Sequence, residues 1–298
     1  MSPFSFIQDF ESYLAIEKRH SQHTVIAYVK DVSDYIEFSG IIKEEEVKEL
    51  NTSIVRAWVV HLKESQLSNR TIQRKLSSVR VFYNWMRQVG IVEKNPTSRI
   101  NGPKVSKRLP VFVKEENLET QTINPLFSDD FTGLRDRLMF EIFYQTGIRL
   151  SELINLKEKD VTQRTIKVLG KRNKERIIPI GNELFCLVQV YQNMKTNLFD
   201  SNDNLFVLDN GKNLYEKFVY RKINIYLGSI TTLDKKSPHV LRHTFATHML
   251  NNGAGLEVLK EILGHANLTA TQVYTHNSFS ELNKVYNQAH PRGSKLNQ

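Results

Sequence analysis

Residues 237–253 read Ser-Pro-His-Val-Leu-Arg-His-Thr-Phe-Ala-Thr-His-Met-Leu-Asn-Asn-Gly, and this stretch decides how the second half of the chain folds. Ser237 is a typical helix-capping residue, and a proline at the next position suits the first turn of a helix. Gly253 is typical of the position just beyond a helix end. Between these ends the apolar side chains recur at helical spacing, as Leu241, Phe245 and Met249. His239 and Arg242 are three residues apart, so the pattern predicts an imidazole and a guanidinium side by side on another face.

The chain that follows this helix brings two more polar side chains. A second helix is predicted over Leu256–Leu263 and ends at Gly264, which leaves His265 immediately beyond a helix terminus. Tyr274 follows on a short segment for which Thr269 is a suitable cap. Taken singly, each has an ordinary structural interpretation, the histidine as a polar loop residue and the tyrosine as one of eleven that pack a ring. Their occurrence together, so soon after the imidazole and guanidinium, favours a functional one.

An apolar segment upstream leads to another charged pair. Residues Leu134–Thr146 are apolar at helical period and end at Gly147, which predicts a buried helix. Arg149 follows two residues later, and Glu152 lies one turn beyond it. At that spacing Glu152 is expected to orient either Arg149 or His239 rather than to transfer protons.

A hairpin is predicted in the same half of the chain. Thr165–Leu169 and Arg176–Ile180 have the composition of short strands, and Gly170–Glu175 forms the turn between them. The turn contains the cationic residues Lys171 and Arg172.

The first 94 residues show helical periodicity and no strand pattern. Four apolar sets predict a four-helix module, with helices near Phe4–Leu14, Val25–Ile36 after the cap candidate Ser21, Val55–Leu62 and Asn69–Val89. One side of the fourth helix is basic, with Arg70, Arg74, Lys75 and Arg80. This side is either an ordinary solvated face or a DNA contact.

Residues 95–114 are predicted to be a linker, because three prolines in twenty residues prevent regular structure. The segment is also basic and lacks acidic residues, with Arg99, Lys104, Lys107, Arg108 and Lys114. Such a linker either follows a phosphate backbone or acts as a plain spacer. A second domain is then expected over 115–298, so the predicted fold is mainly α-helical with one small β-hairpin.

Composition narrows the class of protein. The chain has 298 residues, enough for two domains, and its 41 Lys and Arg against 32 Asp and Glu give a net charge of +9. That surplus suits a nucleic-acid partner without proving one. The single cysteine, Cys186, excludes an internal disulfide and is predicted to be a small buried apolar residue in the run Leu184–Val190. No zinc-ligand spacing, signal peptide or membrane-length apolar run is present, so we expect a soluble cytoplasmic protein without a metal.

These motifs together resemble those of the tyrosine recombinase family, also called the phage integrase family. The resemblance lies in His239-Val-Leu-Arg-His-Thr-Phe-Ala-Thr-His248, Leu263-Gly-His265 and Thr271-Gln-Val-Tyr-Thr-His276, with Thr146-Gly-Ile-Arg149-Leu-Ser-Glu152-Leu and Gly170-Lys171 upstream. Ser21-Gln-His-Thr-Val-Ile-Ala-Tyr28 and Asp31 resemble the family's N-terminal SAM-like core-binding domain. The ending Tyr286-Asn-Gln-Ala-His290-Pro-Arg292 is similar to that of bacterial Xer recombinases, which resolve chromosome dimers. Arg172 is a departure, since those relatives commonly have glycine after the lysine.

The resemblance implies a catalytic set, with Glu152 in support. Its members in family order are Arg149, Lys171, His239, Arg242, His265 and Tyr274. Tyr274 is then the nucleophile that forms a phosphotyrosine bond, His239 the base and Lys171 the acid for the leaving 5′ oxygen. The two arginines and His265 hold the phosphate oxygens, so the reaction is expected to need no metal, ATP or other cofactor.

The resemblance also implies the partners. These are a double-stranded recombination site, a homo- or heterotetramer on two such sites and, as a further candidate, a DNA translocase of the division machinery. DNA contacts are predicted at Arg70, Arg74, Lys75, Lys104, Lys107, Arg108 and Arg172, and the enzyme is expected at the nucleoid. The tail Ser280–His290, with Leu282, Val285 and Tyr286, has an amphipathic pattern that fits either its own domain or a neighbouring subunit.

Three alternatives remain open at the level of sequence. A non-catalytic DNA-binding regulator explains the net charge but not the joint occurrence of the six residues. A metal nuclease is weaker, because no carboxylate cluster accompanies the histidines. An integrase or invertase of a mobile element has the same chemistry as a chromosome resolvase, and active-site residues do not distinguish them because they contact phosphate.

Overall fold

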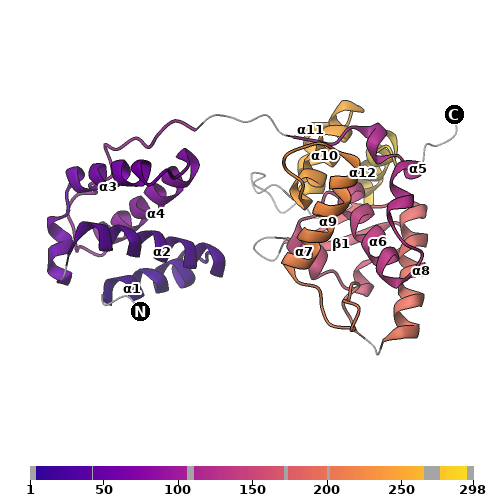
Figure 1. Ribbon diagram of the computed structural model, residues 1–298, viewed down its shortest axis with the longest axis horizontal. Coiled ribbons are helices and arrows are strands. Elements are labelled where there is room, and N and C mark those ends of the chain that lie inside the picture. Colours follow the sequence, from indigo (N-terminus) through magenta and orange to yellow (C-terminus); the bar gives the residue numbers. More distant parts are fainter. Residues whose placement is uncertain are drawn as a thin grey trace. The chain divides into compact units, whose positions relative to one another are not determined.

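The computed structural model describes residues 5–41, 43–105, 111–170, 174–199, 202–264 and 276–293. The chain divides into two compact units, Met1–Arg108 and Leu109–Gln298, each drawn in Figure 1. Both units are mainly helical, and the named strands of the described residues form one two-stranded sheet. The predicted fold class is therefore confirmed.

The first unit is a helical module built around aromatic side chains. Its elements are α1 (Ser5–Ser12), the π-helical turn η1 (Tyr13–Glu17), α2 (Gln22–Ser39), the 3-10 turn η2 (Glu44–Glu49), α3 (Thr52–Glu64) and α4 (Asn69–Gln88). The side chains of Ser21, Asn51 and Ser68 accept hydrogen bonds from backbone N–H groups at the starts of α2, α3 and α4, which satisfies donors that a helix leaves unpaired. The four predicted helices are present at nearly the predicted bounds.

The chain that follows α4 packs back onto the first unit. Ile100 is buried in the first unit's core, and the Arg80 Nη2 donates to its carbonyl over 2.9 Å. Gln73 Nε2 donates to the carbonyl of Pro103 over 3.1 Å. Val113, beyond residues 106–110, is buried in the core of the second unit. The domain limits inferred from sequence, 94 and 115, remain predictions.

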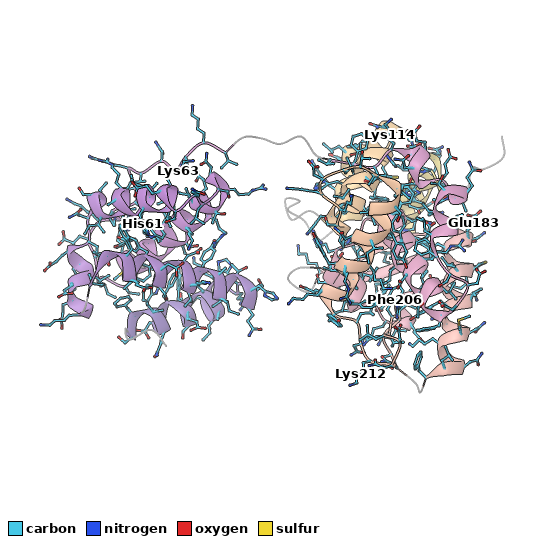
Figure 2. All side chains as sticks on the ribbon, viewed as in Figure 1. His61, Lys63, Lys114, Glu183, Phe206 and Lys212 are labelled. Atoms are coloured by element: carbon cyan, nitrogen blue, oxygen red, sulfur yellow. The ribbon has the colours of Figure 1, made fainter. Side chains whose placement is uncertain are left out.

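The second unit is built around one buried helix, α6. Its elements are the 3-10 turns η3 (Glu115–Leu118), η4 (Asn124–Leu126) and η5 (Glu158–Asp160), helices α5 (Thr120–Ile123), α6 (Phe131–Thr146), α7 (Leu150–Ile154), α8 (Asn182–Leu198), α9 (Glu216–Ile230), α10 (Pro238–Asn251), α11 (Leu256–Leu263) and α12 (His276–Ala289), and strands β1 (Thr165–Leu169) and β2 (Glu175–Pro179). Nearly every residue of α6 is buried, and α8 and α10 pack on it. Figure 2 shows Phe206 inside this unit and Glu183 and Lys212 at its surface.

The hairpin forms as the alternating pattern predicts, with β2 one residue earlier than expected. β1 and β2 are antiparallel, and Val168 lies opposite Arg176. The inward positions of both strands are buried, and Arg176 occupies one of them with 4 % of its surface exposed. A buried arginine in an otherwise apolar row is unusual, because a charge away from water needs partners.

The prediction for Cys186 is wrong, because the structure exposes this side chain. On α8 the buried residues are Leu184, Val188, Tyr191 and Lys195, which share one helix face. Position 186 is two residues from Leu184 and therefore points away from that face, because successive helical residues turn by about 100°. The apolar residues next to Cys186 in the sequence therefore did not indicate that its own side chain is buried.

The tail helix α12 packs on its own unit. Leu282, Tyr286 and Ala289 are buried in the core of the second unit, beside α10 and β2. Asn252 Nδ2 donates to the carbonyl of Ala289 over 3.0 Å and fixes the helix end. Among the described residues, no helix has the length and apolar character needed to cross a bilayer.

Candidate active site

Arg149 lies at the junction of α6 and α7, where the backbone turns sharply. Gly147 ends α6 with φ at +60°, a conformation that favours glycine. Arg149 then occupies the N-cap position of α7, and its backbone N–H donates to Glu152 Oε2 over 2.7 Å. The Arg149 Nη1 donates to Glu152 Oε1 over 2.8 Å, so one carboxylate fixes both the backbone and the guanidinium. About a third of the arginine side chain, 33 %, remains exposed.

Arg242 reaches the same junction from α10. The predicted apolar stripe of this helix is fully buried, which orients the opposite residues toward α7 and α11. Arg242 Nη1 donates to the carbonyl of Gly147 over 2.6 Å, and Nη2 donates to that of Leu263 over 2.7 Å. His239 lies one turn earlier on the helix and is exposed. The structure therefore brings Arg149, Glu152 and Arg242 together, with His239 at the solvent side of the same helix.

The C-terminal end of α11 completes this cluster. The last carbonyl groups of a helix lack internal partners and carry partial negative charge. Besides the contact of Arg242 with Leu263, Arg149 Nη2 donates to the carbonyl of Gly264 over 3.1 Å. Gly264 itself has φ at +64° and closes the helix. Two guanidiniums thus fix the helix end that directly precedes His265.

One residue of the cluster was not predicted from sequence. Arg176 on β2 donates from both terminal nitrogens to the two oxygens of Glu152, each over 2.8 Å. Its Nε donates to the carbonyl of Ile262 over 2.6 Å. The sequence signal that could have identified Arg176 is a charged residue at an inward-facing position of a strand. The apolar residues Ile166, Val168 and Ile178 occupy other inward-facing positions of the hairpin.

The electrostatics of the cluster favour an anion. Burial opposes ionisation of Glu152, but the hydrogen bonds and charge of Arg176 and the bonds from Arg149 lower its pKa to about 2. Burial and the charges of Arg149 and Arg176 lower the pKa of Arg242 to about 10, so it remains protonated at neutral pH. Three guanidiniums around one carboxylate leave a positive excess in a partly desolvated place.

His239 is neutral at neutral pH for related reasons. Partial desolvation lowers its pKa, and the charges of His243, Arg242 and Arg149 lower it further. A neutral imidazole has a nitrogen that accepts a proton, which the charged form lacks. The side chain is therefore in the protonation state that a general base requires.

The other predicted catalytic residues, Lys171, His265 and Tyr274, lie outside the described residues, as do the cap candidate Thr269 and Arg172. The N–H of Gly170 donates to the carbonyl of Lys174 over 2.8 Å and closes the base of the hairpin turn.

The predicted DNA-contact residues of the first unit have different environments. Arg70 is exposed on α4 and Lys104 is exposed in the segment that follows. Arg74 pairs with the buried Asp31, and 46 % of its side chain remains exposed. Lys75 is buried, and its Nζ lies 2.6 Å from Asp34 Oδ2 and 3.2 Å from Asp31 Oδ1. Lys107 and Arg108 fall outside the described residues.

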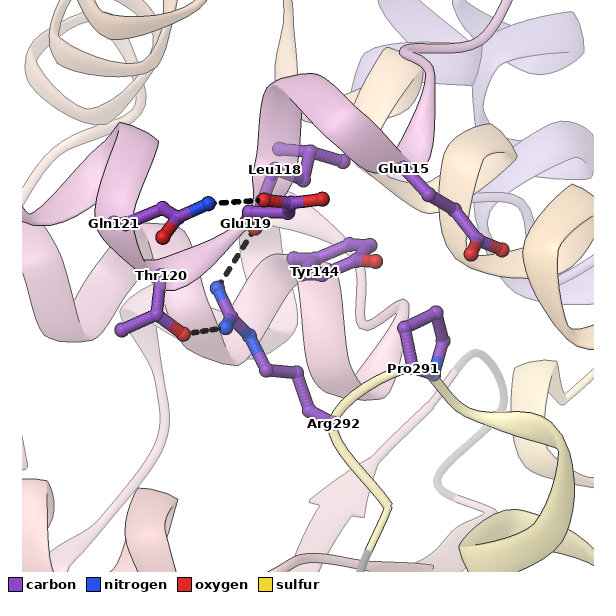
Figure 3. Close-up of a pocket in the computed structure, with 8 residues that line it drawn as sticks. All are labelled: Glu115, Leu118, Glu119, Thr120, Gln121, Tyr144, Pro291 and Arg292. Atoms are coloured by element: carbon purple, nitrogen blue, oxygen red, sulfur yellow. Dashed lines mark hydrogen bonds between the residues drawn. The ribbon is translucent and has the colours of Figure 1, made fainter.

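A pocket of about 370 Å³ lies elsewhere in the second unit and contains none of the predicted site residues (Figure 3). It is lined by Glu115, Leu118, Glu119, Thr120, Gln121, Tyr144, Pro291 and Arg292. Arg292 donates to the carbonyl of Leu118 over 2.8 Å, to Glu141 Oε1 over 3.1 Å and to the Thr120 hydroxyl. These bonds of Arg292 anchor the chain beyond α12 to η3, α5 and α6. Within the described ranges no cluster of three or more His, Cys, Asp or Glu side chains is placed to bind a metal ion.

Comparison with known proteins identifies relatives along nearly the whole chain. The model of the phage integrase family matches residues 112–281, and that of the phage integrase N-terminal SAM-like domain matches residues 7–90. A tyrosine recombinase XerC from Chlorobaculum parvum is 35 % identical over 316 residues, with 96 % of this chain and 94 % of the relative covered. One from Bacillus subtilis is 34 % identical over 302 residues, with 98 % of each chain covered.

Solved structures share the fold. The post-cleavage complex of the XerH site-specific recombinase with palindromic difH substrate has a TM-score of 0.69 at 23 % identity, covering 88 % of this chain and 78 % of that one. A lambda integrase tetramer bound to a Holliday junction has a TM-score of 0.67 at 16 % identity, covering 91 % and 80 %. At these identities the likeness establishes the architecture of the chain.

Proposed function

Because the chain belongs to the phage integrase family of tyrosine recombinases, we propose that it recombines DNA at specific sites through a 3′-phosphotyrosine intermediate. The family cuts and rejoins DNA strands, and this chain is such an enzyme. The observation that carries the proposed mechanism is a positive cluster. In it Arg149 and Arg176 bind the carboxylate of Glu152, and Arg242 binds the carbonyls of Gly147 and Leu263.

Arg149 and Arg242 are proposed to bind the non-bridging oxygens of the scissile phosphate. A guanidinium has five N–H donors, and the bonds described for each arginine occupy two of its nitrogens. Donors therefore remain for a phosphate that approaches the exposed side. Charge grows on the phosphate oxygens as a fifth oxygen approaches phosphorus, and fixed cations stabilise that state more than the ground state.

Tyr274 is proposed to supply the fifth oxygen. Its phenolic oxygen bonds to phosphorus while the bond from phosphorus to the 5′ oxygen breaks, which leaves the DNA joined to the protein through its 3′ phosphate. The phenol has a pKa of about 10 in water, so a base is needed at neutral pH. His239, neutral at that pH, takes the phenolic proton in this mechanism.

Lys171 and His265 are proposed to complete the reaction. The ammonium of Lys171 gives a proton to the departing 5′ oxygen, and His265 donates a further hydrogen bond to the phosphate. Attack by a 5′ hydroxyl on the phosphotyrosine then reverses the step. Attack by the original strand restores the DNA, whereas attack by a partner strand recombines it.

The partner is proposed to be a double-stranded recombination site, bound by four protomers on two sites. XerH and lambda integrase have been solved with DNA, lambda integrase as a tetramer on a Holliday junction. The net charge of +9 and the exposed Arg70 and Lys104 support a polyanionic partner. We place the enzyme at the nucleoid in the cytoplasm, and a DNA translocase of the division machinery is proposed as its regulator.

Resolution of chromosome dimers is the role proposed for this recombinase. Similarity to XerC proteins over nearly the whole of both chains supports it. Integration or inversion of a mobile element is the alternative with the same chemistry.

Covalent capture in the native host tests the proposal. Cells expressing wild-type protein or Tyr274→Phe are denatured, the protein is purified stringently, and DNA still attached is sequenced. Tyr286→Phe is the matched control, because the buried Tyr286 hydroxyl has no hydrogen-bond partner among the described residues and its loss leaves packing intact. We expect DNA with wild type and the control, and none with Tyr274→Phe.

The recovered sequence distinguishes the roles. A single locus near the replication terminus supports chromosome resolution, whereas element ends or invertible promoters favour a mobile element. If a known recombinase yields DNA under the same conditions and wild-type protein yields none, the mechanism is wrong and a non-catalytic DNA-binding role replaces it.

A further inference from the structure

We propose that Arg176 is a positioning residue that holds three parts of the active site in register. These parts are the pair Arg149 and Glu152, the backbone that precedes Lys171, and the backbone that precedes His265. The inference rests on the proposed function, because it assigns Arg176 a role toward residues of that mechanism.

The first contact is with the pair. Glu152 and Arg176 are 6 % and 4 % exposed, and their two parallel hydrogen bonds of 2.8 Å form a bidentate ion pair. Glu152 Oε1 also accepts from Arg149 Nη1, and Oε2 accepts from the Arg149 backbone. Arg176 therefore fixes the carboxylate that orients Arg149. A buried carboxylate without such a partner is costly and tends to become protonated.

The second contact is with the end of α11. Arg176 Nε donates to the carbonyl of Ile262 over 2.6 Å, a group that the helix itself leaves unpaired. A Cβ atom on Gly264 would lie 3.2 Å from both Cδ and Nη1 of Arg176, so the arginine packs directly against the Gly264 backbone. His265 is the next residue along the chain. Arg176 therefore helps to fix the backbone position at which the segment with His265 leaves the helix.

The third contact is with the hairpin. A Cβ atom on Gly170 would lie 3.5 Å from Arg176 Nη1 and 3.7 Å from Glu152 Oε1. The Gly170 backbone therefore packs on the same ion pair, and Lys171 follows it in the chain. Arg176 belongs to β2 itself, so it ties the base of the hairpin to the arginine cluster.

The geometry of these contacts requires an arginine. The side chain binds through Nε, Nη1 and Nη2 in two directions at once, which a planar guanidinium permits. A lysine supplies the charge but only one nitrogen, so it is expected to hold Glu152 without also holding Ile262. A glutamine removes the charge and leaves Glu152 paired with Arg149 alone, which raises the pKa of Glu152 above its present value.

The test compares Arg176→Lys and Arg176→Gln with wild type. The control is Arg164→Gln, which removes an exposed arginine just before β1. The substrate is the duplex recovered by covalent capture, nicked so that the released strand diffuses away. The rate of covalent complex formation is measured in a single turnover from acid to neutral pH, and thermal unfolding of each variant is recorded without DNA.

We expect the glutamine variant to lose about 100-fold in rate, the scale of loss when reacting groups shift by about 1 Å. The lysine variant falls between it and wild type. In wild type the acid limb of the pH profile follows protonation of His239, because Glu152, with a pKa of about 2, stays ionised. Glu152 must be ionised to orient Arg149, so its raised pKa in the glutamine variant adds a second ionisation to the acid limb, which moves to higher pH and becomes steeper. A merely structural loss lowers the rate at every pH and leaves the acid limb in place.

A folded Arg176→Gln protein with the wild-type rate and profile overturns the inference. If Arg176→Gln unfolds, the test relies on Arg176→Lys. A folded Arg176→Lys protein that has the wild-type rate and an unmoved acid limb overturns the inference. Absence of covalent complex with wild type is a different result, since it refutes the proposed function before any variant is compared.

Discussion

At the level of single residues, the site is a set of cations held by a few fixed acceptors. Arg149 and Arg242 are oriented by Glu152 and by the carbonyls of Gly147 and Leu263. These acceptors keep the guanidiniums in place before any substrate arrives. A site that is organised in advance loses less free energy to reorganisation when charge develops on a phosphate.

The pKa of His239 gives a prediction at this scale. Desolvation and the charges of His243, Arg242 and Arg149 lower it from the ordinary 6.5. Because the imidazole accepts a proton only when neutral, base catalysis is complete above this lowered pKa and is lost as pH falls through it. NMR titration of the ring protons should give a His239 midpoint below 6.5, and Arg242→Gln should raise that midpoint.

The control for this titration is Arg164→Gln, since Arg164 is an exposed arginine that does not contribute to the shift. It should leave the midpoint where it is in wild type. A midpoint at or above 6.5 in wild type would remove the basis for assigning His239 as the base.

Sequence identified most of the residues in the cluster but not Arg176. The family resemblance and the one-turn spacing were sufficient for Arg149, Glu152 and Arg242. The role of Arg176 depends on contacts to α7 and α11 that lie far away in sequence, so no local pattern specifies them. The environment of Lys75 was equally hidden, because its partners Asp31 and Asp34 are on another helix.

At the level of elements, helix ends position the site. α6 ends at Gly147, α7 starts at Arg149 and α11 ends at Gly264, so three helix termini meet at the arginine cluster. Glycine signals predicted the ends of α6 and α11 from sequence, whereas the start of α7 at Arg149 was not predicted. Cys186 shows the limit of that approach, since an apolar run in α8 did not reveal which face is buried.

Gly147 is predicted to be more sensitive to substitution than another glycine of the same unit. A Cβ atom there would lie 2.6 Å from Phe245 Cδ1 and 2.9 Å from Leu263 Cδ2, and φ is +60°. Gly253 has φ at +89° with nothing within 4 Å. Left-handed backbone costs a side chain about 1 to 2 kcal/mol at both sites, and overpacking adds about 1 to 3 kcal/mol at Gly147.

Urea unfolding measures this difference. Gly147→Ala should lower the free energy of unfolding by roughly 2 kcal/mol more than Gly253→Ala does. It should also slow covalent complex formation, because the Gly147 carbonyl is a fixed acceptor for Arg242. Equal losses of stability in the two variants would contradict the packing described at the end of α6.

At the level of the whole molecule, the chain combines a positive surplus of +9 with two units that each have a separate core. Length and the prolines of residues 95–114 predicted two domains. The sequence did not predict that the chain after α4 packs on the first unit. The burial of Ile100 in that core depends on tertiary contacts, which no local sequence pattern specifies.

The salt dependence of DNA binding follows from the charge. The logarithm of the affinity for a random-sequence duplex should fall linearly with the logarithm of salt concentration, by about 0.9 for each phosphate neutralised. Arg70→Gln should reduce this slope by about 1, because Arg70 is exposed on the basic side of α4.

Lys75→Gln is the matched comparison on the same helix. Lys75 is already bound to Asp31 and Asp34, so its loss should leave the salt slope unchanged and lower the stability of the first unit. Fluorescence anisotropy across a salt series measures both slopes. A reduced slope for Lys75→Gln with none for Arg70→Gln would contradict the assignment of Arg70 as a DNA contact.

Tyr274 is proposed to carry the DNA during strand exchange, and peptide mapping identifies the residue that does so. Wild-type protein is reacted with the nicked duplex, digested with protease and nuclease, and examined by mass spectrometry for a peptide that retains a nucleotide. We expect a nucleotide joined through its 3′ phosphate to Tyr274, which disappears in Tyr274→Phe and persists in Tyr286→Phe. A nucleotide on any other residue, or a covalent complex that survives Tyr274→Phe, would contradict it.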